Sequence, residues 1–220
     1  MNTLYLHAYH HFFPDQAGNN QNLRHQLKQY GIDSRRQARF TQLALLGALP
    51  LQHRINSQTA VYLSSPYSSP EKFDRAFAAV HQHQTPSPLD FMANTHNAAV
   101  FHLAQLWNIQ AETLFLSIDT HQHWQPVWLA QNYLAHNPDG QILLGWAFEA
   151  GSIGGREGSC WWLLGSKADG ALAEIGFTPS ADNLAATDFL APFTQFEQDI
   201  VWKKKVMFVA EGLAALSVCK

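Results

Sequence analysis

The segment LFLSIDTHQHWQPVWLA, residues 114–130, carries most of the side chains in this sequence that could do chemistry. An apolar run ends at Asp119, and His121, Gln122 and His123 follow before an amphipathic pattern begins. In α/β proteins the carboxyl ends of strands and the amino termini of helices converge, and functional residues gather there. The turn between the strand and the helix is therefore the first candidate site.

A metal site is one interpretation of this turn. His121 and His123 are spaced so that two imidazoles can face one side of an extended segment, as zinc ligands do. No HExxH or HxHxD context supplies a third ligand, and His81 and His83 repeat the spacing with no more support. We expect no metal and no other cofactor, although a small hydrolase using His121 or His123, with a metal or on an acyl thioester, is kept as the alternative function.

A nucleophile turn is the second interpretation. It needs Ser, Cys or Thr at its tip, where the side chain is exposed at the start of a helix. The tip here is His121-Gln122, and Thr120 stands before it. Cys160 and Cys219 lie elsewhere, outside any CxxC pattern, and are expected to be plain thiols. The residues themselves also allow a third interpretation, a solvated loop on an α/β domain of another kind.

Composition limits the class of protein. At 220 residues with 46% hydrophobic residues, the chain is expected to form one globular domain over 1–220. A net charge of -3 with only 14 Lys and Arg argues against nucleic-acid binding. Neither a long uncharged apolar segment nor a signal-peptide pattern is found, so we expect a cytoplasmic protein without a membrane span.

The elements that position the turn alternate between apolar runs of strand length and amphipathic helical patterns. Strands are expected at 3–12, 59–65, 112–119, 141–150 and 158–165. Helices are expected within 20–49, with Ser34 as an N-cap, and at 70–83, 95–108 and 126–136, followed by a helical tail from about 180 that includes 196–218. This alternation predicts an α/β fold with a mostly parallel five-stranded sheet, its last strand antiparallel, and helices on both faces.

The helix expected at 70–83 has a clear apolar face. Pro70 stands near its first position, and Phe73, Phe77 and Val80 recur at helical spacing.

Residues 87–150 resemble the amino-terminal half of the β-ketoacyl synthases of the thiolase fold. In that family a helix beginning near an Asn leads into a buried strand, then to a turn with the catalytic Cys, then to a helix and a strand. Asn97, Asp119-Thr120 and the helix after Gln122 follow the same order. REGSCWWLLGSK, residues 156–167, is similar to the glycine-acid-glycine turn and strand that come later in the family.

The resemblance, which covers most of residues 1–168, implies a subunit without its own chemistry. It places Gln122 at the position of the nucleophilic Cys, and chain length factors, the ketosynthase relatives of type II polyketide synthases, carry Gln there. The HGT-like and GH-like histidine motifs of ketosynthases are also missing from this sequence. The resemblance thus implies a non-catalytic chain length factor with no catalytic residue of its own.

The same resemblance implies the pathway and the partners. The chain would act in aryl-polyene, polyketide or fatty-acid-like elongation, as one half of a heterodimer with a complete ketosynthase. That partner subunit would carry the Cys and both His, and an acyl carrier protein would take part only indirectly.

The family also implies an interface and an acyl tunnel. It places the strand at 112–118 near the two-fold axis, paired antiparallel with the partner's strand, and the segment 88–106 at the end of the partner's tunnel. The residues expected at the tunnel and interface are Phe91, Met92, Asn97, Phe101, Phe115 and Ile118. For Phe101 two interpretations stay open: a gate at the tunnel end, or part of a buried helix stripe with Ala104 and Trp107.

Overall fold

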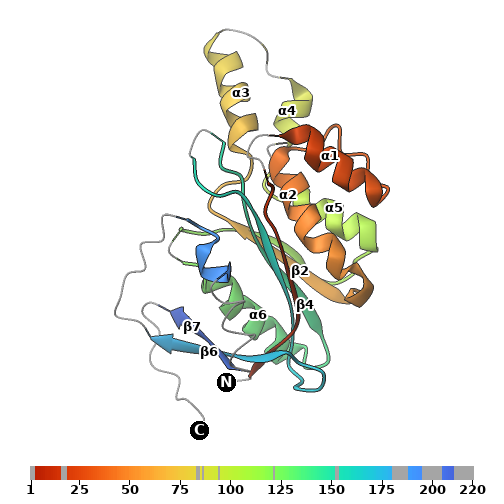
Figure 1. Cartoon of the computed structure of the whole chain (residues 1–220), viewed down its shortest axis with the longest axis vertical. Coiled ribbons are helices and arrows are strands. Elements are labelled where there is room, and N and C mark those ends of the chain that lie inside the picture. The colour runs from red at the N-terminus through yellow and green to blue at the C-terminus, as the bar shows by residue number, and fades with distance from the viewer. Residues whose placement is uncertain are drawn as a thin grey trace.

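The computed structural model describes residues 3–15, 19–82, 85, 87–93, 95–120, 122–151, 154–179, 188–194 and 205–210. In chain order its elements are β1 (Leu4–Phe12), α1 (Asn20–Gln29), α2 (Arg39–Ala48), the 3-10 helix η1 (Leu49–Arg54), β2 (Thr59–Ser65), α3 (Pro70–His81), α4 (Pro88–Ala93), α5 (Ala98–Trp107), β3 (Thr113–Ser117), α6 (Gln125–His136), β4 (Gln141–Phe148), β5 (Gly158–Gly165), β6 (Ala173–Pro179) and β7 (Lys205–Ala210). Figure 1 shows these elements arranged around one central sheet.

The sheet has seven strands in the order β3-β2-β4-β5-β1-β6-β7. All five expected strands are confirmed, and β5 runs antiparallel to β4 as predicted. The expected mostly parallel five-stranded sheet is wrong, because β6 and β7 extend it and β1 pairs antiparallel with both β5 and β6. Among the described strands, the parallel pairs are β3–β2, β2–β4 and β6–β7. The β4–β5 connection contains no described helix, so the chain reverses there instead of crossing over.

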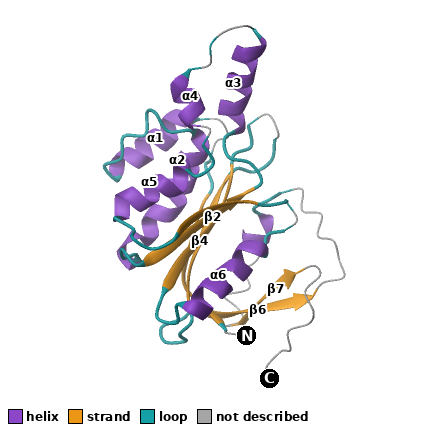
Figure 2. Cartoon of the chain, turned by 180° about the vertical axis from the view of Figure 1, so that it is seen from behind, coloured by secondary structure: helices purple, strands orange, loops and turns teal. Residues whose placement is uncertain are grey.

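Helices cover both faces of the sheet, as expected. On one face Val127, Ala130 and Leu134 of α6 pack into an apolar cluster with alternate residues of β4, among them Leu144 and Trp146. On the other face α1, α2 and α5 bury their apolar stripes against the remaining strand residues. Figure 2 shows α6 on one side of the sheet and α1, α2 and α5 on the other. Strands covered on both faces read as continuous apolar runs, which is why β2, β4 and β5 were recognisable from the sequence.

The helix expected to begin at Ser34 begins later. Helix α2 starts at Arg39, and its N-cap is Ala38, whose side chain cannot accept a hydrogen bond. The acceptor comes instead from the sheet, since Glu149 Oε2 accepts from the Phe40 backbone N–H at 2.7 Å. Ser34 is buried in the preceding turn. The Glu149 carboxylate, from a distant strand, therefore accepts the hydrogen bond of the first helical turn that the Ser34 hydroxyl was expected to accept.

The expectation of a helical tail is wrong at residues 205–210. They form β7, which pairs parallel with β6 from Glu174–Lys205 to Pro179–Ala210. The rest of the expected helix at 196–218 lies outside the described residues. None of the helices in the described ranges combines the length and the apolar character needed to cross a membrane.

Candidate functional site

Gln122 lies in the turn that joins β3 to α6. Its backbone N–H donates to the Asp119 carbonyl at 3.0 Å, and its own carbonyl accepts from the Gln125 N–H at 3.1 Å. Its side-chain Oε1 accepts from the Gln125 Nε2 amide, so the half-buried amide is held against the first turn of α6. The turn is thus the strand-to-helix junction that the sequence predicts, with a carboxamide in it. An amide is neither an acyl acceptor nor a base near neutral pH.

His123 is a core side chain. It is buried, its Nε2 lies 2.8 Å from the Phe189 carbonyl, and its ring contacts the rings of Phe189 and Phe193. Its backbone carbonyl accepts from Trp146 Nε1 at 3.2 Å. His121 lies outside the described residues. Among the residues that are described, no group of three His, Cys, Asp or Glu side chains could hold a metal ion.

Strand β3 forms one edge of the sheet and is only half covered. It pairs with β2 on one side, and Leu114, Phe115 and Leu116 are each partly exposed. The Phe115 ring packs edge-on against Phe40, at 6.1 Å between centroids, and against His96 at 5.7 Å. Ile118 at the end of the strand is buried in the core. The strand therefore presents apolar side chains and one row of backbone groups at the rim of the sheet.

Further apolar side chains stand out from the helices that precede β3. Phe101 of α5 is 55% exposed, and Phe91 and Met92 of α4 are 72% and 65% exposed. Asn97 is exposed as the N-cap of α5, and its side chain makes no cap hydrogen bond. The buried-stripe interpretation of Phe101 is wrong, because the stripe that α5 buries consists of Ala99, Val100 and Leu103.

The apolar face predicted for α3 is likewise turned outward. Phe73, Phe77 and Val80 are all exposed, and the Phe73 and Phe77 rings stack at 6.3 Å between centroids. Helix α4 packs against α3, and Figure 1 shows the two helices projecting together beyond the sheet. An exposed group of large apolar side chains marks an interaction surface more often than chance would give.

Two buried acidic groups stand close to this region and were not singled out from the sequence. Glu149, at the end of β4, accepts from the backbone N–H of Phe40 at 2.7 Å and of Glu71 at 3.1 Å, so one carboxylate joins the first turns of α2 and α3. Burial raises the pKa of Glu149 to about 7, while the two backbone N–H groups act in the opposite direction. Glu157, just before β5, pairs with Arg39 of α2 in the interior. The only sequence signals are that Glu149 directly follows one apolar run and that Glu157 directly precedes the next strand.

Comparison with known proteins identifies the fold. No protein-family model and no curated protein matches the chain. A solved complex of the ketosynthase ApeO with its chain length factor ApeC from Xenorhabdus doucetiae matches with a TM-score of 0.56 and 16% identity over 77% of this chain and 81% of that chain. The ishigamide ketosynthase/chain length factor matches with a TM-score of 0.62 and 15% identity over 77% of this chain and 63% of that chain.

A third structure covers more of the chain. It is AntDE:AntF, a type II polyketide synthase acyl-carrier protein in complex with its ketosynthase, with a TM-score of 0.56 and 11% identity over 96% of this chain and 84% of that chain. At these identities the likeness concerns the fold. The protein has an α/β fold of the thiolase-like kind found in ketosynthase structures.

Proposed function

We propose that this chain is a non-catalytic, chain-length-factor-like subunit that pairs with a complete β-ketoacyl synthase in polyene, polyketide or fatty-acid-like chain elongation. The observation that carries the proposal is β3, an edge strand whose apolar side chains are left half exposed. A rim of this kind is a template for pairing with another strand. Pairing with the ketosynthase would cover it.

The turn before α6 supports a role without chemistry. The condensation that ketosynthases perform needs a thiolate to carry the acyl chain, and Gln122 has none to offer. Cys160, the cysteine within the described residues, is buried in β5 on a different strand from the turn. The His123 side chain is buried in the core, so nothing in the described residues favours the alternative of a hydrolase built on the two histidines.

The size of the matched chains also supports the proposal. For the first complex the covered shares are 77% of this chain and 81% of the other, which makes the two chains similar in length. The same holds for the third, at 96% and 84%. Chains of similar length thus occur in two solved complexes that contain a ketosynthase by name, and the name of the first complex also includes a chain length factor.

Co-purification with a complete ketosynthase tests the proposal. The candidate partner is a ketosynthase that retains the catalytic Cys and both His and is encoded beside this chain. Expressed together, the two should elute as one complex that elongates an acyl chain, and neither should elongate alone. Hydrolysis of an acyl thioester by this chain alone, or separate elution of the two proteins, contradicts the proposal.

Replacing Gln122 by alanine should leave elongation by the pair within about threefold of wild type, because the amide takes no part in acyl transfer. The measurement is the rate of product formation by the purified complex. Replacing the partner's nucleophilic Cys is the comparison, and it should abolish elongation. A loss of similar size in the Gln122→Ala complex contradicts the non-catalytic assignment.

Replacing Phe101 by alanine should lengthen the products while the pair stays assembled. The ring is mostly exposed, so its removal opens no core cavity and should change the free energy of unfolding by about 0.5 kcal/mol or less. Mass spectrometry of the products gives the chain length. Leu172→Ala removes another exposed apolar side chain, outside residues 88–106, and should leave the product length unchanged. Unchanged product length in both variants excludes Phe101 as a gate.

A further inference from the structure

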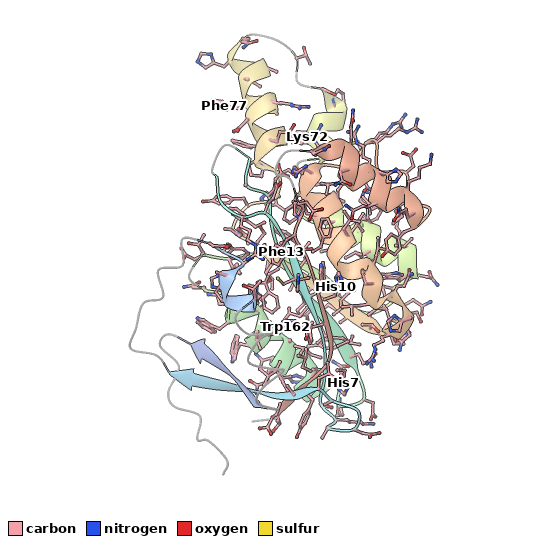
Figure 3. All side chains as sticks on the ribbon, viewed as in Figure 1. His7, His10, Phe13, Lys72, Phe77 and Trp162 are labelled. Atoms are coloured by element: carbon pink, nitrogen blue, oxygen red, sulfur yellow. The ribbon has the colours of Figure 1, made fainter. Side chains whose placement is uncertain are left out.

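A pocket lined with cations lies where α1, α2 and α3 begin. Its volume is about 240 Å³, and the cationic side chains in its lining are Arg24, Arg35, Arg36, Arg39, Lys72 and Arg75. The chain has only 14 Lys and Arg and a net charge of -3, so this concentration is not a general property of its surface. Among the described residues of the lining, Glu71 is the one carboxylate. Figure 3 shows Lys72 at the first turn of α3, close to the start of α1.

Some of these cations already have ionic partners. Arg75 pairs with Glu71 and Arg35 with Asp33 at the surface, and the buried Arg39 pairs with Glu157. Arg24 and Arg36 are exposed and form no ion pair with any residue in the described ranges. These two guanidinium groups are therefore available to an anion from outside. Guanidinium groups bind phosphate through two parallel hydrogen bonds, which a compact ammonium cannot do.

The backbone adds to the positive potential. Asn20 and Arg39 are the first residues of α1 and α2, Glu71 is the second residue of α3, and all three line the pocket. The amino terminus of a helix carries a partial positive charge and favours anions nearby. Glu149 already accepts from the first turns of α2 and α3, and the Asn19 side chain caps α1. The positive charge around this hollow therefore comes chiefly from its cationic side chains.

The pocket also holds a buried acceptor without a donor. Gln42 lines it and is only 1% exposed, and its Oε1 has no hydrogen-bond partner among the described residues. The Nε2 of the same amide donates to the Gln37 carbonyl at 3.0 Å, which fixes the amide's orientation. A buried acceptor left unpaired is costly, so a ligand that brings a hydroxyl would be favoured here.

We propose that this pocket binds a small hydroxylated phosphate ester, with the phosphate held by Arg24 and Arg36 and a hydroxyl donated to Gln42. A hollow of about 240 Å³ admits a phosphate group and a short organic part, whereas an acidic protein surface would meet only its rim. The site is separate from β3 and from the turn at Gln122. Binding of a phosphate ester here therefore does not depend on the proposed pairing with a ketosynthase.

Calorimetric titration of the full chain with glycerol 3-phosphate, and with inorganic phosphate for comparison, tests the site. We expect saturable binding of one ligand per chain, tighter for glycerol 3-phosphate than for inorganic phosphate. Arg24→Gln and Arg36→Gln should each weaken it about tenfold. Lys28→Gln removes the same charge from the same helix, outside the pocket, and should leave binding within about twofold.

Gln42→Met tests the hydroxyl contact separately, because methionine fills similar space without an acceptor. It should reduce the preference for glycerol 3-phosphate over inorganic phosphate while inorganic phosphate still binds. Circular dichroism of each variant confirms that it is folded. Equal weakening by Lys28→Gln, or no saturable binding of either phosphate compound, overturns the proposal. Binding of an acidic protein without binding of phosphate also overturns it and assigns the cations to a protein interface.

Discussion

Replacing Arg39 by methionine is expected to lower the free energy of unfolding by about 3 to 5 kcal/mol. The side chains of Arg39 and Glu157 are only 4% and 5% exposed. Arg39 Nε donates to Glu157 at 2.9 Å, its Nη2 donates to the other carboxylate oxygen, and its Nη1 donates to Asn20 Oδ1 at 2.6 Å. Methionine fills much of the space but leaves the carboxylate buried without its cation, and breaking a buried pair in this way costs about that much.

Urea unfolding followed by tryptophan fluorescence measures the effect. Replacing both members, with Arg39→Met and Glu157→Met in one chain, should recover most of the lost free energy, because neither member is then left buried as an unpaired charge. The control is the pair Lys167–Asp139, whose side chains are 68% and 85% exposed. Lys167→Met should change the unfolding free energy by about 0.5 kcal/mol or less. A similarly small effect of Arg39→Met contradicts the assigned role of the buried pair.

The limits of prediction from this sequence are visible at the start of α2. Local rules place an N-cap at Ser34, because a hydroxyl before a helical pattern ordinarily accepts from the first turn. The structure starts the helix at Arg39, and the acceptor for Phe40 is Glu149, 109 residues further along the chain. An acceptor supplied by a distant strand leaves no mark on the local pattern.

In the sheet, too, local patterns could be predicted from the sequence and contacts between distant segments could not. Its central strands are long apolar runs covered on both faces, so their positions could be predicted, while their order depends on contacts between distant segments. Strand β7 was missed for a different reason. KVMFVA, residues 205–210, is a short run followed by Glu, Gly, Leu and Ala, and the surrounding helix formers outweighed its β-branched residues. Its pairing with β6 supplies hydrogen bonds that propensity does not describe.

For the candidate site, the position of the turn could be predicted from the sequence, but the burial or exposure of the individual side chains could not. The apolar run before Asp119 and the helical pattern after it are enough to predict a strand-to-helix junction. The burial of His123 depends on Phe189, 66 residues away, and the sequence pattern around the turn carries no sign of a contact between such distant segments. The exposure of Phe101 depends on which side of α5 meets the sheet, and an apolar residue on every side of that helix leaves the choice to tertiary packing.

Replacing Ser117 by proline is expected to dissociate the proposed pair while the chain itself stays folded. Along β3 the bonds to β2 run from the Val61 N–H to the Glu112 carbonyl at 2.9 Å and from the Ile118 N–H to the Ser65 carbonyl at 3.2 Å. Along a strand, the backbone N–H and C=O groups of successive residues point alternately to its two sides. The backbone groups of the even-numbered residues point to β2, so the N–H of Ser117 points to the open edge. Proline there removes one outward donor and places a ring in the path of an incoming strand.

Size-exclusion chromatography and the elongation rate measure the outcome. If the partner pairs with this edge, Ser117→Pro should weaken the complex by about 100-fold or more, because strand pairing along β3 is interrupted. Ser117→Ala keeps the N–H and should assemble as wild type does. Thr113→Pro blocks the other end of the same edge. It covers the case in which the partner strand pairs with only the first part of β3 and does not reach Ser117. If both proline variants are folded and bind the ketosynthase with wild-type affinity, β3 is not the pairing strand, and the observation on which the proposed function rests is lost.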